Sequence, residues 1–426
     1  MKRVIIITYY WPPAGGPGVQ RWLNFVKYLK DFDIEPIVYT PENPNYPIVD
    51  SDLLKVVPEN IEVIKRPIRE PYQLAKIFSK KKTQQISKGI ISEKDPSSIE
   101  KMMLYVRGNY FIPDARIGWV KPSVAFLKDY LNNNDIETII TTGPPHSMHL
   151  IGLRLKKLLD VNWIADFRDP WTTIHYHKSL RLSKSSEEKH KKLEAEVLQN
   201  ADHILVTSKR TEEEFSAITD TAVTVITNGY DVTEVIKPEL DKDFSLAHIG
   251  SLLSERNPRI LWEILKELCA ENENFNDHLS IKLAGVVSDD VIQSIKEFDL
   301  ESKVDYVGYV SHSEAKQLQH NSQVLLLLEI DKPETRAIIP GKLFEYLMAK
   351  RPIIALGPEG SDMEDILNET NAGHFFTTSE KQEIKEQLLQ YFSAFEQGDL
   401  QVRTKGIDRY SRYELTRSLS KVIHGL

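Results

Sequence analysis

The stretch that decides the fold is Thr335–Leu356, TRAIIPGKLFEYLMAKRPIIAL. A Pro-Gly pair at 340–341 interrupts regular structure, helix-forming residues follow, and Lys-Arg-Pro at 350–352 ends the helix. The apolar run Ile353–Leu356 is typical of a parallel strand that is covered on both faces. The stretch therefore predicts a loop, a short helix and a buried strand, which is the repeating unit of an α/β fold.

The start of this helix has the residues of an anion-binding site. Gly341 lets a ligand approach the backbone closely, and the free N–H groups of a helix N-terminus favour a phosphate. Lys342 adds a positive charge, and Glu345, one turn later, offers a carboxylate that accepts hydrogen bonds from a vicinal diol. A nucleotide-sugar pocket needs such a cation and such a carboxylate. The plainer interpretation is an amphipathic helix with a solvated Glu, as in any α/β protein.

Length and composition predict a globular protein of two or three domains. The 426 residues exceed one ordinary core, and the contents of 41% hydrophobic and 27% charged residues are those of a globular chain. A formal net charge of -8 argues against nucleic acid as a partner. The single cysteine, Cys269, excludes a disulfide framework, and we find neither a signal-peptide pattern nor a membrane-spanning run. We expect a cytoplasmic protein and leave open a peripheral position at the inner face of the membrane.

Predicted strands and helices alternate along most of the chain. The first strand, Val4–Thr8, leads into a glycine-rich loop and then into a helix with apolar residues at helical spacing. Gly15 and Gly16 in this loop suit the close approach of a phosphate, although the loop does not spell the dinucleotide fingerprint GxGxxG. A flexible loop that faces an interdomain cleft is the alternative. The alternation begins again at Leu246, which predicts a second doubly wound parallel-sheet domain.

Two further segments place polar residues where predicted strands end. The string TTGPPHSMH puts His146 and His149 after one strand, and DFRDPW puts Asp169 after the next. Ligands bind at the carboxyl ends of strands in open α/β sheets, so His146 and Asp169 are candidate site residues. The plainer interpretation of DFRDPW is a structural ion pair between Arg168 and a carboxylate.

Residues 65–107 contain eleven Lys or Arg against four acids, with apolar and aromatic residues between them. An aromatic-rich segment continues this pattern to Trp119. We interpret 65–119 as an insertion whose surface is drawn to anionic lipid headgroups or to an acceptor that carries a lipid diphosphate. A solvated insertion without a ligand is the alternative.

Five strings occur in a defined order: TGPPHSMHLIG, DFRDPW, ITNGYD, HIGSLLSERNP and PGKLFEYLMAKRPIIAL. Together they resemble the family 4 glycosyltransferases of GT-B fold, in particular those of bacterial cell-surface polysaccharides, over nearly the whole chain. The resemblance implies two Rossmann-like doubly wound parallel-sheet domains facing across a cleft. We expect an acceptor-binding domain over 1–237, a nucleotide-sugar-binding domain over 238–405, and a helix over 406–426 that crosses back to the first domain.

The resemblance also implies roles for individual residues. Glu345 matches the glutamate that holds the donor ribose, and Arg256 matches the basic residue that grips the diphosphate. Gly250 opens the loop that the diphosphate approaches, while Gly15 and Gly16 match the glycine loop near the donor phosphate and the acceptor.

Other positions depart from the family pattern. Ala337 stands where the family commonly has a further glutamate, and Glu334 and Glu329 are at the wrong spacing to replace it. Ser251 stands where a basic residue often follows the glycine, and we expect Lys342 to supply that charge. The departures concern the donor sugar and the catalytic geometry more than the nucleotide site.

The resulting expectation is a retaining transfer from a UDP- or GDP-linked sugar to a glycan or lipid-linked acceptor, with no other cofactor. No DxD motif lies in a suitable context, so we expect no metal. Asp169 is the candidate carboxylate for an oxocarbenium-like transition state, and His146 the candidate proton carrier or diphosphate contact. The alternatives are a nucleotide-sugar epimerase of the same fold and a non-catalytic sugar-nucleotide-binding protein.

Overall fold

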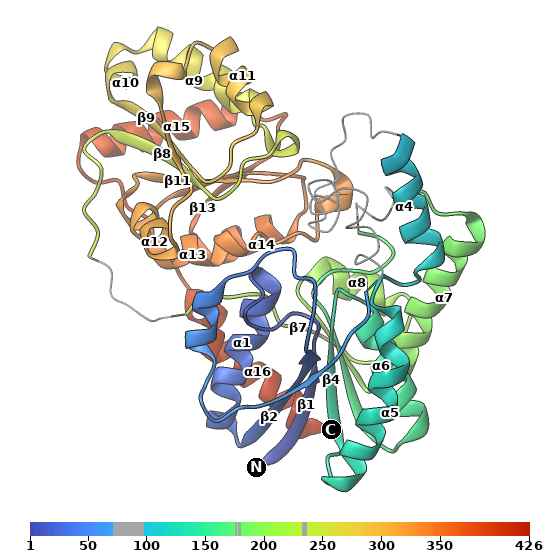
Figure 1. Ribbon diagram of the computed structural model, residues 1–426. Helices are drawn as coiled ribbons and strands as arrows, with labels where there is room; N and C mark the ends of the chain where they lie inside the picture. Colours follow the sequence, from blue (N-terminus) through green and yellow to red (C-terminus); the bar gives the residue numbers. More distant parts are fainter. Residues whose placement is uncertain (71–97, 175–176, 178–179, 232–236) are drawn as a thin grey trace. The chain divides into compact units, whose positions relative to one another are not determined.

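The computed structural model describes residues 1–70, 98–174, 177, 180–231 and 237–426 (Figure 1). The chain divides into two compact units, which have a different extent from the expected domains. The first unit comprises Met1–Thr227 together with Arg412–Leu426, and the second comprises Asn228–Ser411. Each unit contains one parallel sheet with helices packed against it.

The first unit contains a seven-stranded sheet in the order β3-β2-β1-β4-β5-β6-β7. The paired strands are parallel, as the alternation of strands and helices predicts. The strands are β1 (Lys2–Ile7), β2 (Ile34–Pro41), β3 (Glu62–Arg66), β4 (Thr138–Gly143), β5 (Asn162–Phe167), β6 (His203–Val206) and β7 (Val223–Val225). The helices are α1 (Pro17–Leu29), α4 (Ser98–Tyr110), α5 (Ile117–Asn133), α6 (Ser147–Leu158), α7 (Lys184–Asn200), α8 (Lys209–Ser216) and α16 (Arg412–Gly425).

Both faces of this sheet are covered, because alternate residues of a strand point to opposite sides. On β1, Ile5 and Ile7 belong to one hydrophobic cluster, while Val4 and Ile6 belong to another. The first cluster includes residues of α5 and α6, and the second includes residues of α1 and α16. The last helix thus contributes to the same core as the first strand.

The second unit contains a six-stranded parallel sheet in the order β10-β9-β8-β11-β12-β13. Its strands are β8 (Phe244–Ile249), β9 (Leu279–Ala284), β10 (Val304–Gly308), β11 (Val324–Leu328), β12 (Ile353–Leu356) and β13 (Gly373–Phe376). Its helices are α9 (Arg259–Glu271), α10 (Glu273–His278), α11 (Asp289–Glu297), α12 (His312–Asn321), α13 (Gly341–Ala349), α14 (Asp362–Thr370) and α15 (Lys381–Glu396). The prediction of two Rossmann-like doubly wound domains is confirmed.

The stretch that decides the fold forms the predicted elements. Helix α13 begins at Gly341 and ends at Ala349, and Lys350 caps it with a left-handed backbone conformation (φ 53°). The four residues of β12 are all buried, as expected for a strand between two neighbours that is covered on both faces.

The expected insertion is only partly described, because its residues 71–97 lie outside the described residues. The described ends belong to the domain itself: β3 pairs with β2, and Arg116 lies 3.2 Å from the buried carboxylate of Glu70. Trp119 is buried and stacks on Tyr39, with 5.0 Å between ring centroids, so its assignment to an exposed aromatic surface was wrong. In the described part of the chain, no helix is both long and apolar enough to cross a membrane.

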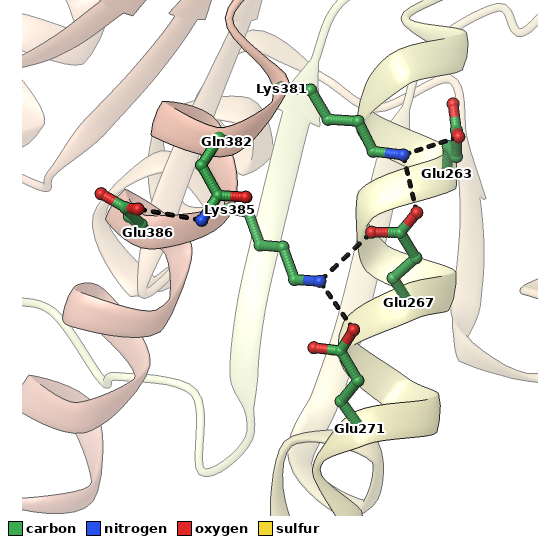
Figure 2. Close-up of polar contacts among 7 residues, drawn as sticks. All are labelled: Glu263, Glu267, Glu271, Lys381, Gln382, Lys385 and Glu386. Carbon is green, nitrogen blue, oxygen red and sulfur yellow. Dashed lines mark hydrogen bonds and ion pairs between the residues drawn. The ribbon is translucent and has the colours of Figure 1, made fainter.

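A ladder of ion pairs joins α9 to α15 (Figure 2). The Lys381 ammonium lies 2.7 Å from Glu263 and 2.6 Å from Glu267, and Lys385 lies 3.2 Å from Glu267 and 2.7 Å from Glu271. Most of these side chains are at least a third exposed, so solvent and salt screen the ladder. The buried apolar residues of α15 therefore do more than the ladder to hold this helix.

Candidate functional site

The first turn of α13 lies beside the carboxyl end of β8. The Ile249 N–H donates to the buried Tyr346 hydroxyl (3.0 Å), which ties the helix to the strand. Lys342 reaches across to β8, where its Nζ lies 2.9 Å from Nε2 of His248. Pro340 precedes the helix, and no side chain of the described residues caps it. The candidate site therefore combines a helix N-terminus and a cationic side chain at one edge of the sheet.

Gly250 forms the wall against which the Lys342 ammonium lies. Its φ of 125° is a conformation that side-chain-bearing residues rarely adopt, and a Cβ there would lie 2.7 Å from Nζ of Lys342. Gly285, with φ 111°, lies next to it, because a Cβ on Gly285 would be 2.8 Å from the carbonyl carbon of Gly250. The two glycines therefore let the Lys342 side chain and the neighbouring backbone pack closely at this position.

Arg256 and Glu329 form an ion pair close enough to Lys342 for both charges to act on it. Nε of Arg256 donates to Oε1 of Glu329 at 2.7 Å, and the same oxygen accepts the Ile330 N–H at 2.9 Å. The Glu329 side chain is only 3% exposed, while that of Arg256 is 29% exposed. Glu329 thus fixes one edge of the guanidinium. In the sequence, Glu329 is at the wrong spacing to replace the further glutamate of the family, so it was not predicted as a site residue. Its position directly after an apolar strand was a signal of a site.

Burial and charge both act on Lys342. Desolvation and the nearby Arg256 charge lower the pKa of Lys342 to about 8, and Glu329 and Glu345 only partly oppose this. Because the pKa of Lys342 is lowered in the free protein, a bound negative charge stabilises the charged form of this side chain. An anionic ligand is therefore expected to raise this pKa and to bind with uptake of a proton above about pH 8.

Glu345 is oriented by a neighbouring helix. Its Oε2 accepts a hydrogen bond of 2.8 Å from Nε2 of Gln319, a residue of α12 that is only 1% exposed. Glu345 itself is half-buried. A carboxylate that one partner holds in place and that retains further acceptor capacity suits a pair of hydroxyl groups. Sequence reasoning found Glu345 but not Gln319.

In the first unit, Arg168 connects two of the predicted segments. Its Nε donates to the carbonyl oxygen of Gly143 at 3.2 Å, and it also contacts the carbonyl of Pro144. A Cβ on Gly18 would lie 1.7 Å from Nη1 of Arg168, so the guanidinium packs on the bare first turn of α1. Desolvation lowers the pKa of Arg168, and the negative charge of Asp169 opposes that shift.

The DFRDPW segment contains a buried ion pair between Asp166 and Arg21 of α1. Asp166 is fully buried and accepts hydrogen bonds from Arg21 (2.8 Å), Trp22 (2.7 Å) and Thr142 (2.7 Å). Desolvation raises the pKa of Asp166, but the Arg21 charge and these hydrogen bonds hold it below its usual value. Asp166 therefore has a structural role, in joining α1 to two strands of the sheet.

His146 lies in a stack of rings at the start of α6. Its ring is parallel to that of Trp171, with an interplanar angle of 2° and 4.9 Å between centroids. Desolvation, helped by the nearby His149 and Arg168, lowers the pKa of His146 well below its usual value. Its Nδ1 is buried and has no hydrogen-bond partner among the described residues. Near neutral pH the His146 ring is therefore uncharged, with a hydrogen on one ring nitrogen and a lone pair on the other.

The glycine loop of the first unit leads into α1. The Gly15 N–H donates to the Ile48 carbonyl at 3.0 Å, and a Cβ on Gly15 would lie 2.8 Å from Cγ2 of Ile48. Gly16 has φ 101° and precedes the first residue of α1, with no atom within 4 Å of the place where its Cβ would be. Gly15 is thus required by space, and Gly16 by its backbone conformation.

The structure brings Gly250, Arg256 and Lys342 together in the second unit, with Gly341 and Glu345 on the same helix as Lys342. In the first unit, His146 and Asp169 follow β4 and β5, and the glycine loop follows β1. Among the described residues, no group of three or more His, Cys, Asp or Glu is arranged to hold a metal ion.

Comparison with solved structures identifies the architecture. The chain is similar to sucrose-phosphate synthase from Thermosynechococcus elongatus, with 12% identity, a TM-score of 0.64, and 100% and 99% of the two chains covered. It is also similar to HepE of Anabaena in complex with UDP and glucose, with 12% identity, a TM-score of 0.62, and 100% of both chains covered. The two units have the GT-B fold.

The GT-B fold is not restricted to transferases. A putative UDP-N-acetylglucosamine 2-epimerase from Listeria monocytogenes matches at 11% identity with a TM-score of 0.56, and 99% and 96% of the two chains are covered. Sequence profiles of known families give no match to this chain, and a search of curated proteins gives none. The function must therefore be argued from the residues of the site.

Proposed function

We propose that the protein is a glycosyltransferase that moves a sugar from a nucleoside diphosphate sugar to a hydroxyl acceptor. The observation that carries the proposal is the group formed by Lys342 and Arg256 beside the bare backbone of Gly250, with Glu345 one turn along α13. The cations suit a diphosphate and the carboxylate suits a ribose. Solved structures of similar fold include one with UDP and glucose bound, which supports this class of donor.

The reaction requires stabilisation of the negative charge that develops on the leaving group. As the glycosidic bond breaks, the nucleoside diphosphate gains negative charge, and cations or helix N-termini in a fixed position stabilise it. Lys342, Arg256 and the start of α13 at Gly341 would supply positive charge, so we propose a transfer that needs no metal.

We propose that the first unit binds the acceptor. Asp169 is the proposed carboxylate for a positively charged transition state with retention at the anomeric carbon. His146, as an uncharged ring with one N–H, is the proposed proton carrier or diphosphate contact. Gly15 and Gly16 would let the donor phosphate or the acceptor approach the backbone. We propose a glycan or a lipid-linked precursor as the acceptor.

The test of the donor class is a thermal-shift panel of UDP, GDP, ADP and their sugars, with and without EDTA. A ligand that binds the native state raises the unfolding midpoint by mass action. We expect one base to give a selective shift that EDTA does not change. Absence of a shift with every nucleotide would refute the proposed function, and a shift that EDTA abolishes would refute the metal-independent mechanism.

Replacing Glu345 by Gln is expected to weaken binding of the selected nucleoside diphosphate by about 1–3 kcal/mol, because a charge-assisted hydrogen bond is lost. Titration calorimetry measures this difference. Glu386→Gln is the matched control, since Glu386 lies on the surface of α15, where it accepts a hydrogen bond from Gln382 (2.9 Å; Figure 2). Equal affinities of the two variants for the nucleoside diphosphate would contradict the proposed contact between Glu345 and the ribose.

The alternative function is epimerisation of the sugar on the nucleotide, which the match to a putative epimerase of the same fold favours. The two activities differ in their need for an acceptor. Incubation of the donor sugar alone would give an epimeric nucleotide sugar if the protein were an epimerase, and proton NMR distinguishes the epimers. A transferase leaves the sugar configuration of the donor unchanged under these conditions. A nucleotide shift without either activity would favour the non-catalytic binding protein.

A peripheral position at the membrane rests on helix α4. Its exposed side chains include Met102 (66% exposed), Tyr105 (44%) and Tyr110 (74%), and Lys101 and Arg107 are on the same helix. Apolar and cationic side chains on one helix suit an anionic lipid surface, so we propose that α4 contacts it. Cosedimentation with vesicles that contain anionic lipid is expected, and equal binding to neutral vesicles would contradict the electrostatic part of the proposal.

A further inference from the structure

We propose that His248 is a positioning residue that holds the Lys342 ammonium against Gly250, ready for a diphosphate. This inference rests on the proposed function, since it assigns a purpose to the place that Lys342 occupies. It is carried by the fully buried His248 ring, which lies between the end of β8 and the first turn of α13. His248 was not among the residues that the sequence indicated.

The hydrogen bonds of His248 fix its tautomer. An ammonium has donors only, so the 2.9 Å contact with Lys342 requires an unprotonated Nε2 that accepts. The proton of the neutral ring is then on Nδ1, which lies 3.1 Å from the carbonyl oxygen of Leu326 and donates to it. Leu326 is in β11, the strand next to β8. The sheet therefore orients the imidazole, and the imidazole in turn orients the lysine.

The surroundings keep His248 neutral. Desolvation and the charges of Lys342 and Arg256 lower its pKa well below the usual value, against the opposite effect of the Leu326 and Ser251 backbone groups. Protonation of His248 would place two cations in contact, so the ring serves Lys342 as an acceptor and not as a second positive charge. This distinguishes the arrangement from a cluster of cations that would bind the anion directly.

The charged groups around Lys342 come from every element that packs on it. Arg256 follows β8, Glu329 follows β11, Glu345 is on α13, and His248 is on β8. His248 is the group that accepts a hydrogen bond from the ammonium, while the other three act on it through their charges. A neutral acceptor stabilises the charged form of a lysine without neutralising it, so the charge remains available to a ligand.

Two substitutions of His248 test the roles of its two ring nitrogens separately. In His248→Asn the amide lies near the place of Nδ1, so the contact with Leu326 is kept and the acceptor for Lys342 is lost. In His248→Gln the amide reaches the place of Nε2, so the acceptor for Lys342 is kept. The first measurement is the pKa of Lys342 in the ligand-free protein, obtained from a pH titration in which NMR observes the side-chain nitrogen of Lys342. We expect a lower pKa in His248→Asn than in the wild type or in His248→Gln.

The second measurement is the affinity for inorganic pyrophosphate and for UDP or GDP between about pH 6.5 and 9.5, a window that spans the pKa of Lys342. We expect affinity to fall about tenfold in His248→Asn, with the alkaline decline shifted to lower pH, and to be largely kept in His248→Gln. If both variants lose affinity equally with an unchanged pH profile, His248 is only structural and the inference is wrong.

A measurement on the wild type covers the case in which a variant does not fold. Nitrogen NMR of the His248 ring should show a protonated Nδ1 and an unprotonated Nε2, and the opposite tautomer would overturn the inference. Failure of the proposed function has a separate signature, because a wild-type protein that binds neither pyrophosphate nor any nucleotide would refute that proposal. The tautomer and the pKa of Lys342 would still decide the role of His248.

Discussion

Lys342→Met is expected to lower the affinity for UDP or GDP by about 100-fold, because the diphosphate loses a charged hydrogen-bond donor in a partly desolvated position. The methionine keeps most of the packing of the lysine stem. The free-protein pKa of Lys342, about 8, also predicts the pH dependence. Affinity of the wild type should be full below pH 8 and should fall as the pH rises above it, since the neutral amine no longer attracts the anion.

Calorimetry at several pH values measures both effects in one series. Lys350→Met is the matched control, because Lys350 is exposed at the other end of the same helix. The Lys342→Met protein should show weak binding with little pH dependence in this window, while the control retains the affinity and the pH profile of the wild type. A retained alkaline decline in the Lys342→Met protein would assign the titration to another group and would contradict the proposed role.

Asp166→Asn is expected to destabilise the first unit by about 3–5 kcal/mol, which is the usual effect of leaving one partner of a buried ion pair alone. The Arg21 and Asp166 side chains are 1% and 0% exposed, so water cannot replace the lost carboxylate. The amide nitrogen also replaces one of the two carboxylate oxygens, so its donors face the donor of either Arg21 or Trp22. Urea denaturation, followed by tryptophan fluorescence, measures the free energy of unfolding.

Acid denaturation gives an independent test of the same pair. Because the folded-state pKa of Asp166 is held below its usual value, its contribution is present near neutral pH and is lost as the pH falls through the folded pKa. The Asp166→Asn protein should therefore lose less stability than the wild type on acidification. Glu196→Gln, which removes an ion pair with Lys157 on the surface, is the control and should change the stability by less than about 1 kcal/mol. A similarly small change for Asp166→Asn would contradict the structural role.

An uninterrupted apolar run located the strand of the deciding stretch. Strand β12 has the predicted bounds, Ile353–Leu356, because a strand inside a parallel sheet is apolar on both faces. The strands β3 and β13 were missed. They lie at the edges of the two sheets, and their sequences EVIKR and GHFF lack an apolar run because their residues are mostly exposed or half-buried.

The candidate site was predictable to the extent that one segment contains it. Gly341, Lys342 and Glu345 belong to a single helix, so local pattern was sufficient to group them. His248 and Glu329 belong to other strands or follow them, and only the order of strands in the sheet shows that they reach Lys342 and Arg256. A charged or polar residue at the end of an apolar strand is the local signal, and it does not specify the partner.

Helix α16 has a consequence for how the protein is made. Leu419 and Ile423 are fully buried in the same hydrophobic cluster as Val4 and Ile6. During synthesis the first strand leaves the ribosome long before these residues, since the whole of Asn228–Ser411 is translated in between. Domains generally fold as units in the order of their synthesis, but here the unit that begins first cannot complete its core until Ile423 has emerged. The nascent first unit must therefore keep an apolar face uncovered while the second unit is already able to fold, and it is then a natural client for chaperones.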